Sequence, residues 1–125
     1  MVLDFVFLIL DIAKPNGTRS TTFTKAYGSN YIIGTGSFLQ TKRLDLVYEP
    51  DDKEVLPTLG LRFFTPSEIA LLHGIPLKGD SCKLRYSFEF PTKINVQQQY
   101  RLLGNSLNVK VVACILNHLL NKKDE

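Results

Sequence analysis

Residues 65–76 read TPSEIALLHGIP, and this stretch marks both ends of one helix. Thr65, followed by proline and then Glu68, is typical of a capping box, in which the two side chains bond each other's backbone amides. The isoleucine and leucines that follow predict an apolar helix face. Gly74 can adopt a left-handed cap and Pro76 blocks continuation, so we expect the helix to end just before Gly74.

Two more helices are predicted downstream of this one. A short helix is expected from Val96 to Leu103, stopped by Gly104, and a longer one from about Leu107 to Leu120. In the longer helix, apolar residues recur at helical spacing and predict a face packed against a core. These residues are Val111, Val112, Ile115, Leu119 and Leu120. Cys114, in the same helix, is expected to be a small buried hydrophobic residue.

Gly104-Asn105-Ser106 joins the two helices and has two interpretations. Asparagine and serine are preferred at helix N-caps, so the turn can be purely structural, and the residue pattern alone favours this interpretation. Alternatively, the free amides of a helix start and two polar side chains form a site for a ligand carboxylate or phosphate.

The first part of the chain is basic and rich in hydroxyl groups. Between Ile12 and Leu44 there is no acidic residue. The cations are Lys14, Arg19, Lys25, Lys42 and Arg43, and the interleaved aromatic residues are Phe23, Tyr27, Tyr31 and Phe38. Cations and hydroxyls suit phosphate oxygens, and exposed aromatic rings stack on unpaired bases. This segment therefore indicates nucleic-acid contact, the alternative being a solvated basic face whose aromatic residues belong to the core.

The sign of the charge reverses between residues 45 and 54, which contain five acidic residues and a single lysine. Prolines lie nearby, as is typical of an exposed connector.

The whole chain of 125 residues suits one domain or a piece of one. Its apolar run Phe5–Leu10 is bracketed by Asp4 and Asp11 and is far shorter than the about 20 residues of a membrane span. A buried strand or short core helix is expected there, with no membrane partner.

No complete catalytic or metal site can be assembled from the sequence. The two cysteines form no CxxC pair, and the chain has no HExxH motif and no phosphate-binding glycine loop. His73, near a helix end, is interpreted as a packing or dipole-compensating residue rather than a catalytic base. We therefore assign no catalytic and no metal-binding residue.

Three passages together resemble the C-terminal part of the cytosine-C5 methyltransferase family. LDIAKPNGTRSTTFTKAYGSNYIIGTGSFLQ, residues 10–40, is similar to the target-recognition region of the branch called DNA methyltransferase two, which acts on the anticodon loop of aspartate tRNA. LRFFTPSEIALLHGIP, residues 61–76, resembles the family's ninth motif. QQQYRLLGNSLNVKVVACIL, residues 97–116, resembles its tenth motif.

The resemblance implies an α+β fragment in three parts. Residues 1–44 would be a partial, loop- and strand-rich target-recognition region, 45–60 an acidic connector, and 61–125 helices that in the family complete an α/β Rossmann-like methyltransferase domain. S-adenosylmethionine is the implied cofactor, with Asn105 and Ser106 as contacts. The implied nucleic-acid contacts are Arg19, Thr24, Lys25 and Thr35.

The chain also departs from the family pattern. The family's nucleophilic cysteine lies in a Pro-Cys-Gln motif that is missing here, and neither Cys82 nor Cys114 inherits its role. The Glu-Asn-Val motif, the Gln-x-Arg-x-Arg motif and the cofactor loop are missing too, and Thr22 replaces the branch's usual cysteine. The stretch from residue 77 to 89 is longer than its counterpart in the family.

These observations predict the C-terminal fragment of an S-adenosylmethionine-dependent tRNA (cytosine-5) methyltransferase that is inactive alone. The alternatives are a non-catalytic RNA-binding module and one half of a split enzyme that needs an N-terminal partner. The expected substrate is tRNA, with DNA as another candidate, and the expected location is the cytoplasm, the nucleus or both. The last helix should carry an apolar face that lacks its sheet partner, which favours association or partial disorder.

Overall fold

The computed structural model describes residues 10–30, 32–49, 52–78 and 87–121. Along the chain it contains strands β1 (Ile12–Ala13) and β2 (Phe38–Leu39), the 3-10 helix η1 (Leu56–Leu59), and strand β3 (Arg62–Phe63). Helices α2 (Pro66–Leu72), α3 (Val96–Gly104) and α4 (Val109–Leu120) follow. The strand or helix expected at Phe5–Leu10 lies almost wholly outside the described residues, as do Tyr31 and Cys82.

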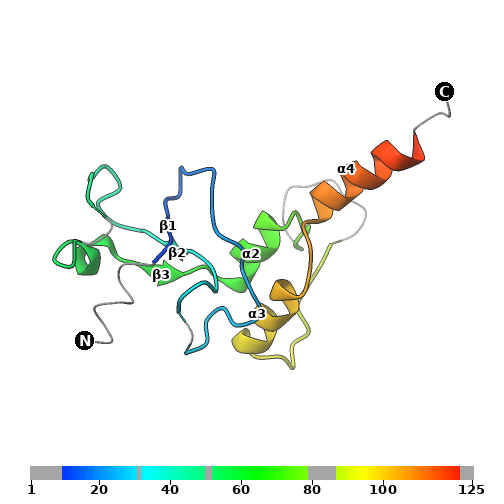
Figure 1. Cartoon of the computed structure of the whole chain (residues 1–125). Coiled ribbons are helices and arrows are strands. Elements are labelled where there is room, and N and C mark those ends of the chain that lie inside the picture. Colours follow the sequence, from blue (N-terminus) through cyan, green and yellow to red (C-terminus); the bar gives the residue numbers. More distant parts are fainter. Residues whose placement is uncertain (1–9, 31, 50–51, 79–86, 122–125) are drawn as a thin grey trace.

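A small sheet joins the basic first part of the chain to the helical second part. Strand β2 lies in the centre, parallel to β1 and antiparallel to β3, with Phe38 paired to both Ile12 and Phe63. A parallel pair needs a long crossover, and here the crossover is the loop of residues 14–37, which passes close to α2 and α3 (Figure 1). Strands from the predicted recognition region and from the predicted helical part therefore pair in one sheet. The described residues of the expected exposed connector, 45–49 and 52–54, include no buried residue, whereas Leu56 and Leu59 of the following helix η1 are buried.

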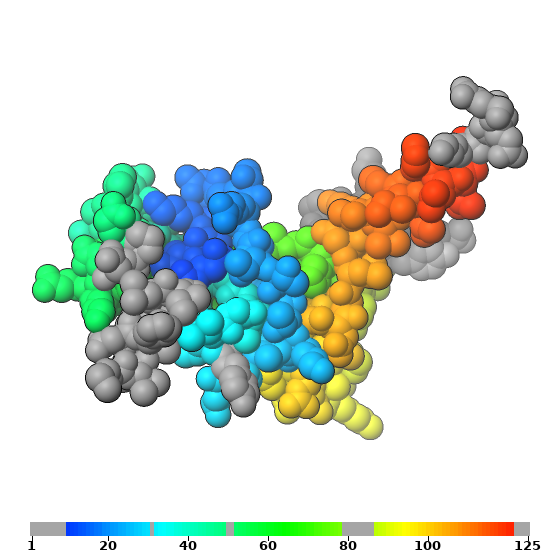
Figure 2. Space-filling model, in the orientation of Figure 1, coloured from blue at the N-terminus to red at the C-terminus, as the bar shows by residue number. Residues whose placement is uncertain are grey.

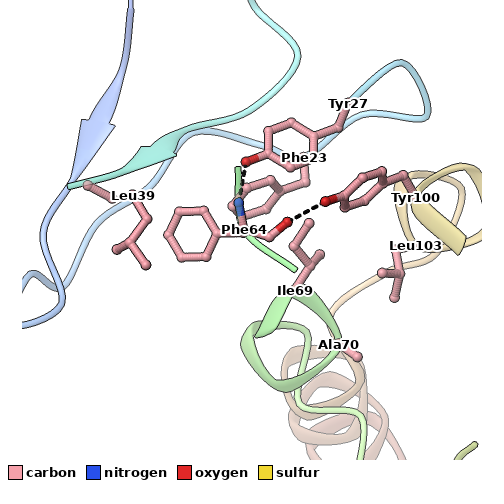
Figure 3. Close-up of a cluster of buried hydrophobic side chains, with 9 residues drawn as sticks. Phe23, Tyr27, Leu39, Phe64, Ile69, Ala70, Tyr100 and Leu103 are labelled. Carbon is pink, nitrogen blue, oxygen red and sulfur yellow. Dashed lines mark hydrogen bonds between the residues drawn. The ribbon is translucent and has the colours of Figure 1, made fainter. Parts of the chain in front are cut away.

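An aromatic core connects this loop with β3, α2 and α3. Figure 3 shows the hydroxyls of Tyr27 and Tyr100 directed at the backbone of Phe64, which follows β3. Tyr27 donates its hydroxyl to the Ser37 carbonyl at 2.6 Å and accepts the Phe64 amide at 2.8 Å. The Tyr100 hydroxyl donates to the Phe64 carbonyl at 2.6 Å. Burial raises the pKa of the Tyr27 hydroxyl well above its usual range, so this group stays protonated.

The interpretation that the aromatic residues of the basic segment belong to the core is confirmed for two of them. Phe23 and Tyr27 are buried and pack edge to face, with ring centroids 5.1 Å apart. Phe38 is half-buried and packs on Phe63, with ring centroids 4.9 Å apart. These rings therefore hold the loop against the core and are not surfaces for stacking on bases.

Helix α2 has the ends that the sequence predicts. Both hydrogen bonds of the capping box between Thr65 and Glu68 are present. Gly74 has φ 71° and so takes the left-handed conformation that favours glycine. The Arg62 guanidinium donates two hydrogen bonds to the Glu68 carboxylate, at 2.9 and 2.8 Å, and lowers the pKa of that carboxyl to about 2.

The ends of α3 and α4 differ from the prediction by up to two residues. Gly104 is the last residue of α3 rather than its stop, and Asn105 is the C-cap, with φ −95°. Asn108, and neither Asn105 nor Ser106, caps the start of α4 by accepting the Val111 amide at 3.1 Å. The structural role considered for Asn105-Ser106 as an N-cap is therefore wrong, because the chain makes another four-residue turn before α4 begins.

Helix α4 has no buried residue and projects from the rest of the molecule (Figures 1 and 2). The prediction that its apolar residues face a core is wrong for the described part of the chain, since Ile115, Leu119 and Leu120 are all exposed. Cys114 is also exposed, contrary to prediction, because the whole helix lies away from the core. The amphipathic pattern identifies an apolar face but does not supply a partner for it.

The segment Val96–Leu120 has the length and composition of a membrane span, since an 18-residue window within it has a mean hydropathy of 1.2. Its backbone is not one continuous helix, however, because the turn at residues 105–108 separates α3 from α4. Helix α4 alone has 12 residues, fewer than the about 20 that cross a bilayer.

Candidate cofactor and nucleic-acid site

A cleft of about 380 Å³ separates the basic loop from the turn between α3 and α4. One wall is the loop at residues 20–23, and the other is formed by the end of α2 and the turn before α4. Its lining residues are Ser20, Thr21, Thr22, Phe23, Leu72, His73, Gly104, Ser106, Leu107 and Asn108. The cleft therefore combines hydroxyl and amide groups with a small apolar surface.

The two walls meet where the backbone of Thr24 and Lys25 lies directly on Gly104. A Cβ atom at Gly104 would lie 2.6 Å from Lys25 Cα, and closer still to the Lys25 amide nitrogen and the Thr24 carbonyl carbon. Only glycine permits this approach, because the obstructing atoms belong to a backbone that cannot rotate away. This contact fixes the loop beside the turn that carries Asn105 and Ser106.

The end of α2 holds the turn in place from the other side. The Val109 amide donates to the His73 carbonyl at 2.8 Å, and Asn108 Nδ2 donates to the Leu72 carbonyl at 3.1 Å. Ser106 Oγ donates to the Leu103 carbonyl at 2.8 Å and lies 3.4 Å from His73 Nδ1. The turn is therefore preorganised by backbone and side-chain bonds to two helices.

One of the two residues predicted to contact a cofactor, Ser106, lines this cleft. The other, Asn105, is exposed and precedes Ser106 in the chain, but it is not among the lining residues. Within the described residues the Asn105 carboxamide has no hydrogen-bond partner, so it can both donate to and accept from a ligand. A ligand with an apolar ring system and several polar groups, such as S-adenosylmethionine, fits the chemistry of this lining as one wall of a site.

The residues predicted to contact nucleic acid lie along the same loop but differ in accessibility. Arg19 is exposed beside a cleft of about 240 Å³, and Lys25 is exposed at a depression of about 440 Å³. Thr24 is half-buried, and its hydroxyl accepts the Ala26 amide at 3.3 Å. Thr35 is only 5% exposed and donates to the Ile32 carbonyl, so its hydroxyl serves the loop itself.

Two residues at these sites were not predicted from the sequence. Arg101 of α3 lines the depression beside Lys25, a placement that depends on the packing of the loop on Gly104. His73 lines the cleft, although its position at a helix end indicated only a packing role. The sequence holds no local signal for either, because each site is assembled from segments far apart in the chain. Among the described residues, no cluster of three or more histidine, cysteine or acidic side chains could hold a metal ion.

Comparison with known proteins identifies relatives along nearly the whole chain. The model of the family described as C-5 cytosine-specific DNA methylase matches residues 12–121. The mouse and human enzymes named tRNA (cytosine(38)-C(5))-methyltransferase are each 48% identical over 122 residues, which cover 90% of this chain. A Dictyostelium discoideum protein named DNA (cytosine-5)-methyltransferase is 38% identical over 118 residues. The chain spans 27% of the mouse enzyme, 29% of the human enzyme and 28% of the Dictyostelium protein.

Solved structures of similar proteins have the same arrangement of elements. The Schizosaccharomyces pombe Dnmt2 methyltransferase superposes with a TM-score of 0.68 at 32% identity, over 90% of this chain and 31% of that protein. A variant of the Spodoptera frugiperda DNMT2 gives a TM-score of 0.70 at 33% identity, over 94% of this chain and 37% of that one.

Proposed function

Because the chain belongs to the C-5 cytosine-specific DNA methylase family, we propose that it forms the C-terminal part of an S-adenosylmethionine-dependent tRNA (cytosine-5) methyltransferase. The names of the mouse and human relatives support tRNA as the substrate. The Dictyostelium relative is named as a DNA methyltransferase, so DNA is a second candidate substrate that the experiment has to test. A substrate of this kind agrees with the cytoplasmic or nuclear location expected from the sequence.

The observation that carries this proposal is the contact of Thr24 and Lys25 with Gly104. It joins the loop that resembles a target-recognition region to the turn that resembles the cofactor motif. A methyltransferase has to present its substrate base to the methyl group, so its recognition and cofactor elements must keep a fixed distance. A contact between two backbones maintains that distance better than a contact between flexible side chains.

In this proposal the chain binds and positions, and the reacting thiolate comes from elsewhere in the enzyme. The sequence has no Pro-Cys-Gln motif, and its described cysteine, Cys114, lies on the projecting helix α4. Asn105 and Ser106 would contact the cofactor, which supplies the methyl group when bound. Loss of Asn105 should therefore weaken cofactor binding and leave the fold intact, since its side chain supports no other described group.

Arg19, Lys25 and Arg101 would contact the phosphates of the RNA. Lys25 and Arg101 come from different elements and flank one depression, and neither forms an ion pair with a described acidic residue. Each phosphate that such a cation neutralises releases counterions, so binding should weaken steeply with salt.

A chimeric enzyme tests the proposal. This chain replaces the matching 122 residues of the mouse relative, and methyl transfer from labelled cofactor to aspartate tRNA is measured. We expect activity in the chimera, a clear loss in its Asn105→Ala variant, and background counts for the chain alone. DNA of the same sequence is assayed in parallel to compare the substrates. An inactive but folded chimera, or turnover by the chain alone, would refute the proposal.

The exposed apolar face of α4 favours one further candidate, half of a split enzyme, since this face requires a partner. Co-expression of the chain with the N-terminal part of the mouse relative as a separate polypeptide should then give a stable complex that binds the cofactor. If the chain binds RNA but forms no such complex, the RNA-binding module is the better description.

A further inference from the structure

The described lining of the cleft contains one titratable side chain, that of His73. Its ring is half-buried at the end of α2 and lies 3.4 Å from Ser106 Oγ, on the residue expected to contact the cofactor. The proposed function gives this histidine no task, and packing alone does not require an imidazole.

The hydrogen bonds of Ser106 determine which nitrogen of His73 carries the proton. A serine hydroxyl has one hydrogen, and here it is directed to the Leu103 carbonyl at 2.8 Å, which can only accept. With its hydrogen so directed, Ser106 Oγ can engage His73 Nδ1 at 3.4 Å only as an acceptor, and this contact requires the tautomer protonated at Nδ1. In the neutral ring, Nε2 then carries the lone pair. Ser106 retains one lone pair and no free hydrogen, so it can only accept a hydrogen bond from a ligand.

We propose that His73, neutral and protonated at Nδ1, is a positioning residue that fixes Ser106 as an acceptor and makes the cleft selective for a cationic, hydrogen-donating ligand. This inference rests on the proposed function and concerns how the same cleft recognises its ligand. The ammonium group of S-adenosylmethionine is both cationic and hydrogen-donating, and its sulfonium group adds a second positive charge. The demethylated product, S-adenosylhomocysteine, keeps the ammonium but has a neutral thioether.

Burial keeps the His73 ring neutral, and the charges around it define its response to pH. Burial lowers the pKa of His73 from its ordinary value. Of the elements packed against it, α4 brings a cation, because the side chain of Lys110 lies over Gly74. The loop wall at residues 20–23 carries no charged side chain. When acid adds a second proton to the ring, the cleft gains a positive charge that repels a cationic ligand.

The first experiment measures the histidine directly in the whole chain, with 15N-labelled imidazole rings followed by NMR over a pH titration. We expect His73 to be protonated at Nδ1 at pH 7.5 and to titrate below the ordinary pKa of a histidine, with the exposed His118 followed in the same spectra as the internal control. The Ser106→Ala variant should lose the preference for Nδ1. A dominant Nε2–H tautomer, or identical behaviour of the two histidines, would overturn the proposal.

The second experiment measures binding of S-adenosylmethionine and S-adenosylhomocysteine to the chimera by calorimetry at pH 7.5 and 5.5. The affinity for S-adenosylmethionine should fall several-fold at the lower pH, by less than about tenfold because burial holds the pKa of His73 below its ordinary value, and the affinity for the product should fall less. His73→Asn retains a donor near Nδ1 and should remove most of this pH dependence, whereas His73→Leu should weaken binding at both pH values. His118→Gln should behave as the unsubstituted chimera does.

A pH effect that persists in His73→Asn, or an equal effect on both ligands, would overturn the inference. The two proposals fail in different ways. A chimera that binds neither ligand at pH 7.5 contradicts the proposed function, whereas the NMR titration still reports on the contact between His73 and Ser106.

Discussion

Substitution of Gly104 by alanine tests the contact that joins the two walls of the cleft. The added methyl group would lie 2.6 Å from Lys25 Cα, and the neighbouring backbone atoms of Thr24 and Lys25 are closer still. An ordinary contact begins at about 3.4 Å. The loop therefore has to move by roughly 1 Å, since neither backbone can turn away.

Two opposing terms determine the size of the effect. Alanine in place of glycine in a helix interior stabilises by about 0.5–1 kcal/mol, and the gain is at most about 0.5 kcal/mol at Gly104, which is the last residue of α3 and has no positive φ. Overpacking of a tight contact costs about 1–3 kcal/mol, and a clash with backbone belongs at the upper end of that range. We therefore expect a net loss of about 2 kcal/mol in the free energy of unfolding.

Urea denaturation followed by far-ultraviolet circular dichroism measures this loss in the chain, and methyl transfer measures its consequence in the chimera. Gly34→Ala is the control, because a Cβ at Gly34 meets nothing within 4 Å and its φ of 68° costs only local strain. Gly104→Ala should reduce methyl transfer, and Gly34→Ala should have little effect on it. A Gly104→Ala protein as stable and as active as the parent would refute the view that the backbone contact sets the geometry of the cleft.

Three further predictions concern single side chains. Tyr27→Phe should lower the free energy of unfolding, measured in urea, by about 3 kcal/mol, because it leaves a buried carbonyl and a buried amide unpaired. The control Tyr48→Phe removes one part-buried hydrogen bond and should cost about 1 kcal/mol. Equal costs for the two variants would contradict this account. Because the pKa of Glu68 is lowered from 4.5 to about 2 in the folded protein, its contribution to stability is fully present above pH 4.5 and disappears as the pH falls toward 2. Glu68→Gln can still cap α2, so denaturation curves at pH 5 and 3 should show that it removes this pH dependence of the free energy of unfolding. Arg101→Ala should reduce the slope of log affinity for tRNA against log salt concentration by about 1 in filter-binding assays. Lys93 lies at none of the clefts described above, so the control Lys93→Ala should leave the slope unchanged. An unchanged slope for Arg101→Ala would show that Arg101 does not contact the RNA.

The features predicted correctly from the sequence are those that depend on neighbouring residues. The ends of α2 follow from Thr65, Glu68 and Gly74 alone, since capping bonds span three residues and the left-handed cap needs only a glycine. The resemblance to the methyltransferase family likewise rests on contiguous motifs, and the match of the family model to residues 12–121 confirms it.

The features that the sequence did not reveal depend on contacts between distant segments. Gly104 was interpreted as a helix stop, although its absent side chain makes room for the backbone of Thr24 and Lys25. Asn105 and Asn108 are equally suitable N-caps by residue type. In the structure Asn108 is the N-cap of α4, and its side chain also donates a hydrogen bond to the Leu72 carbonyl, 36 residues away in the chain. The periodicity of α4 predicted its apolar face correctly, but no periodicity indicates whether the surface that covers it lies in the same chain.

The bonds of Tyr27 also determine when this region can fold during synthesis. The Tyr27 hydroxyl accepts the amide of Phe64, 37 residues later, and the Tyr27 carbonyl accepts Gln97 Nε2, 70 residues later. At about 5–20 residues per second, a ribosome needs roughly 4–14 s to travel from Tyr27 to Gln97. During that interval the nascent basic loop can pack on Phe63 and Phe64 but still lacks Gln97 and Tyr100. Its final conformation is therefore acquired only after α3 has been synthesised.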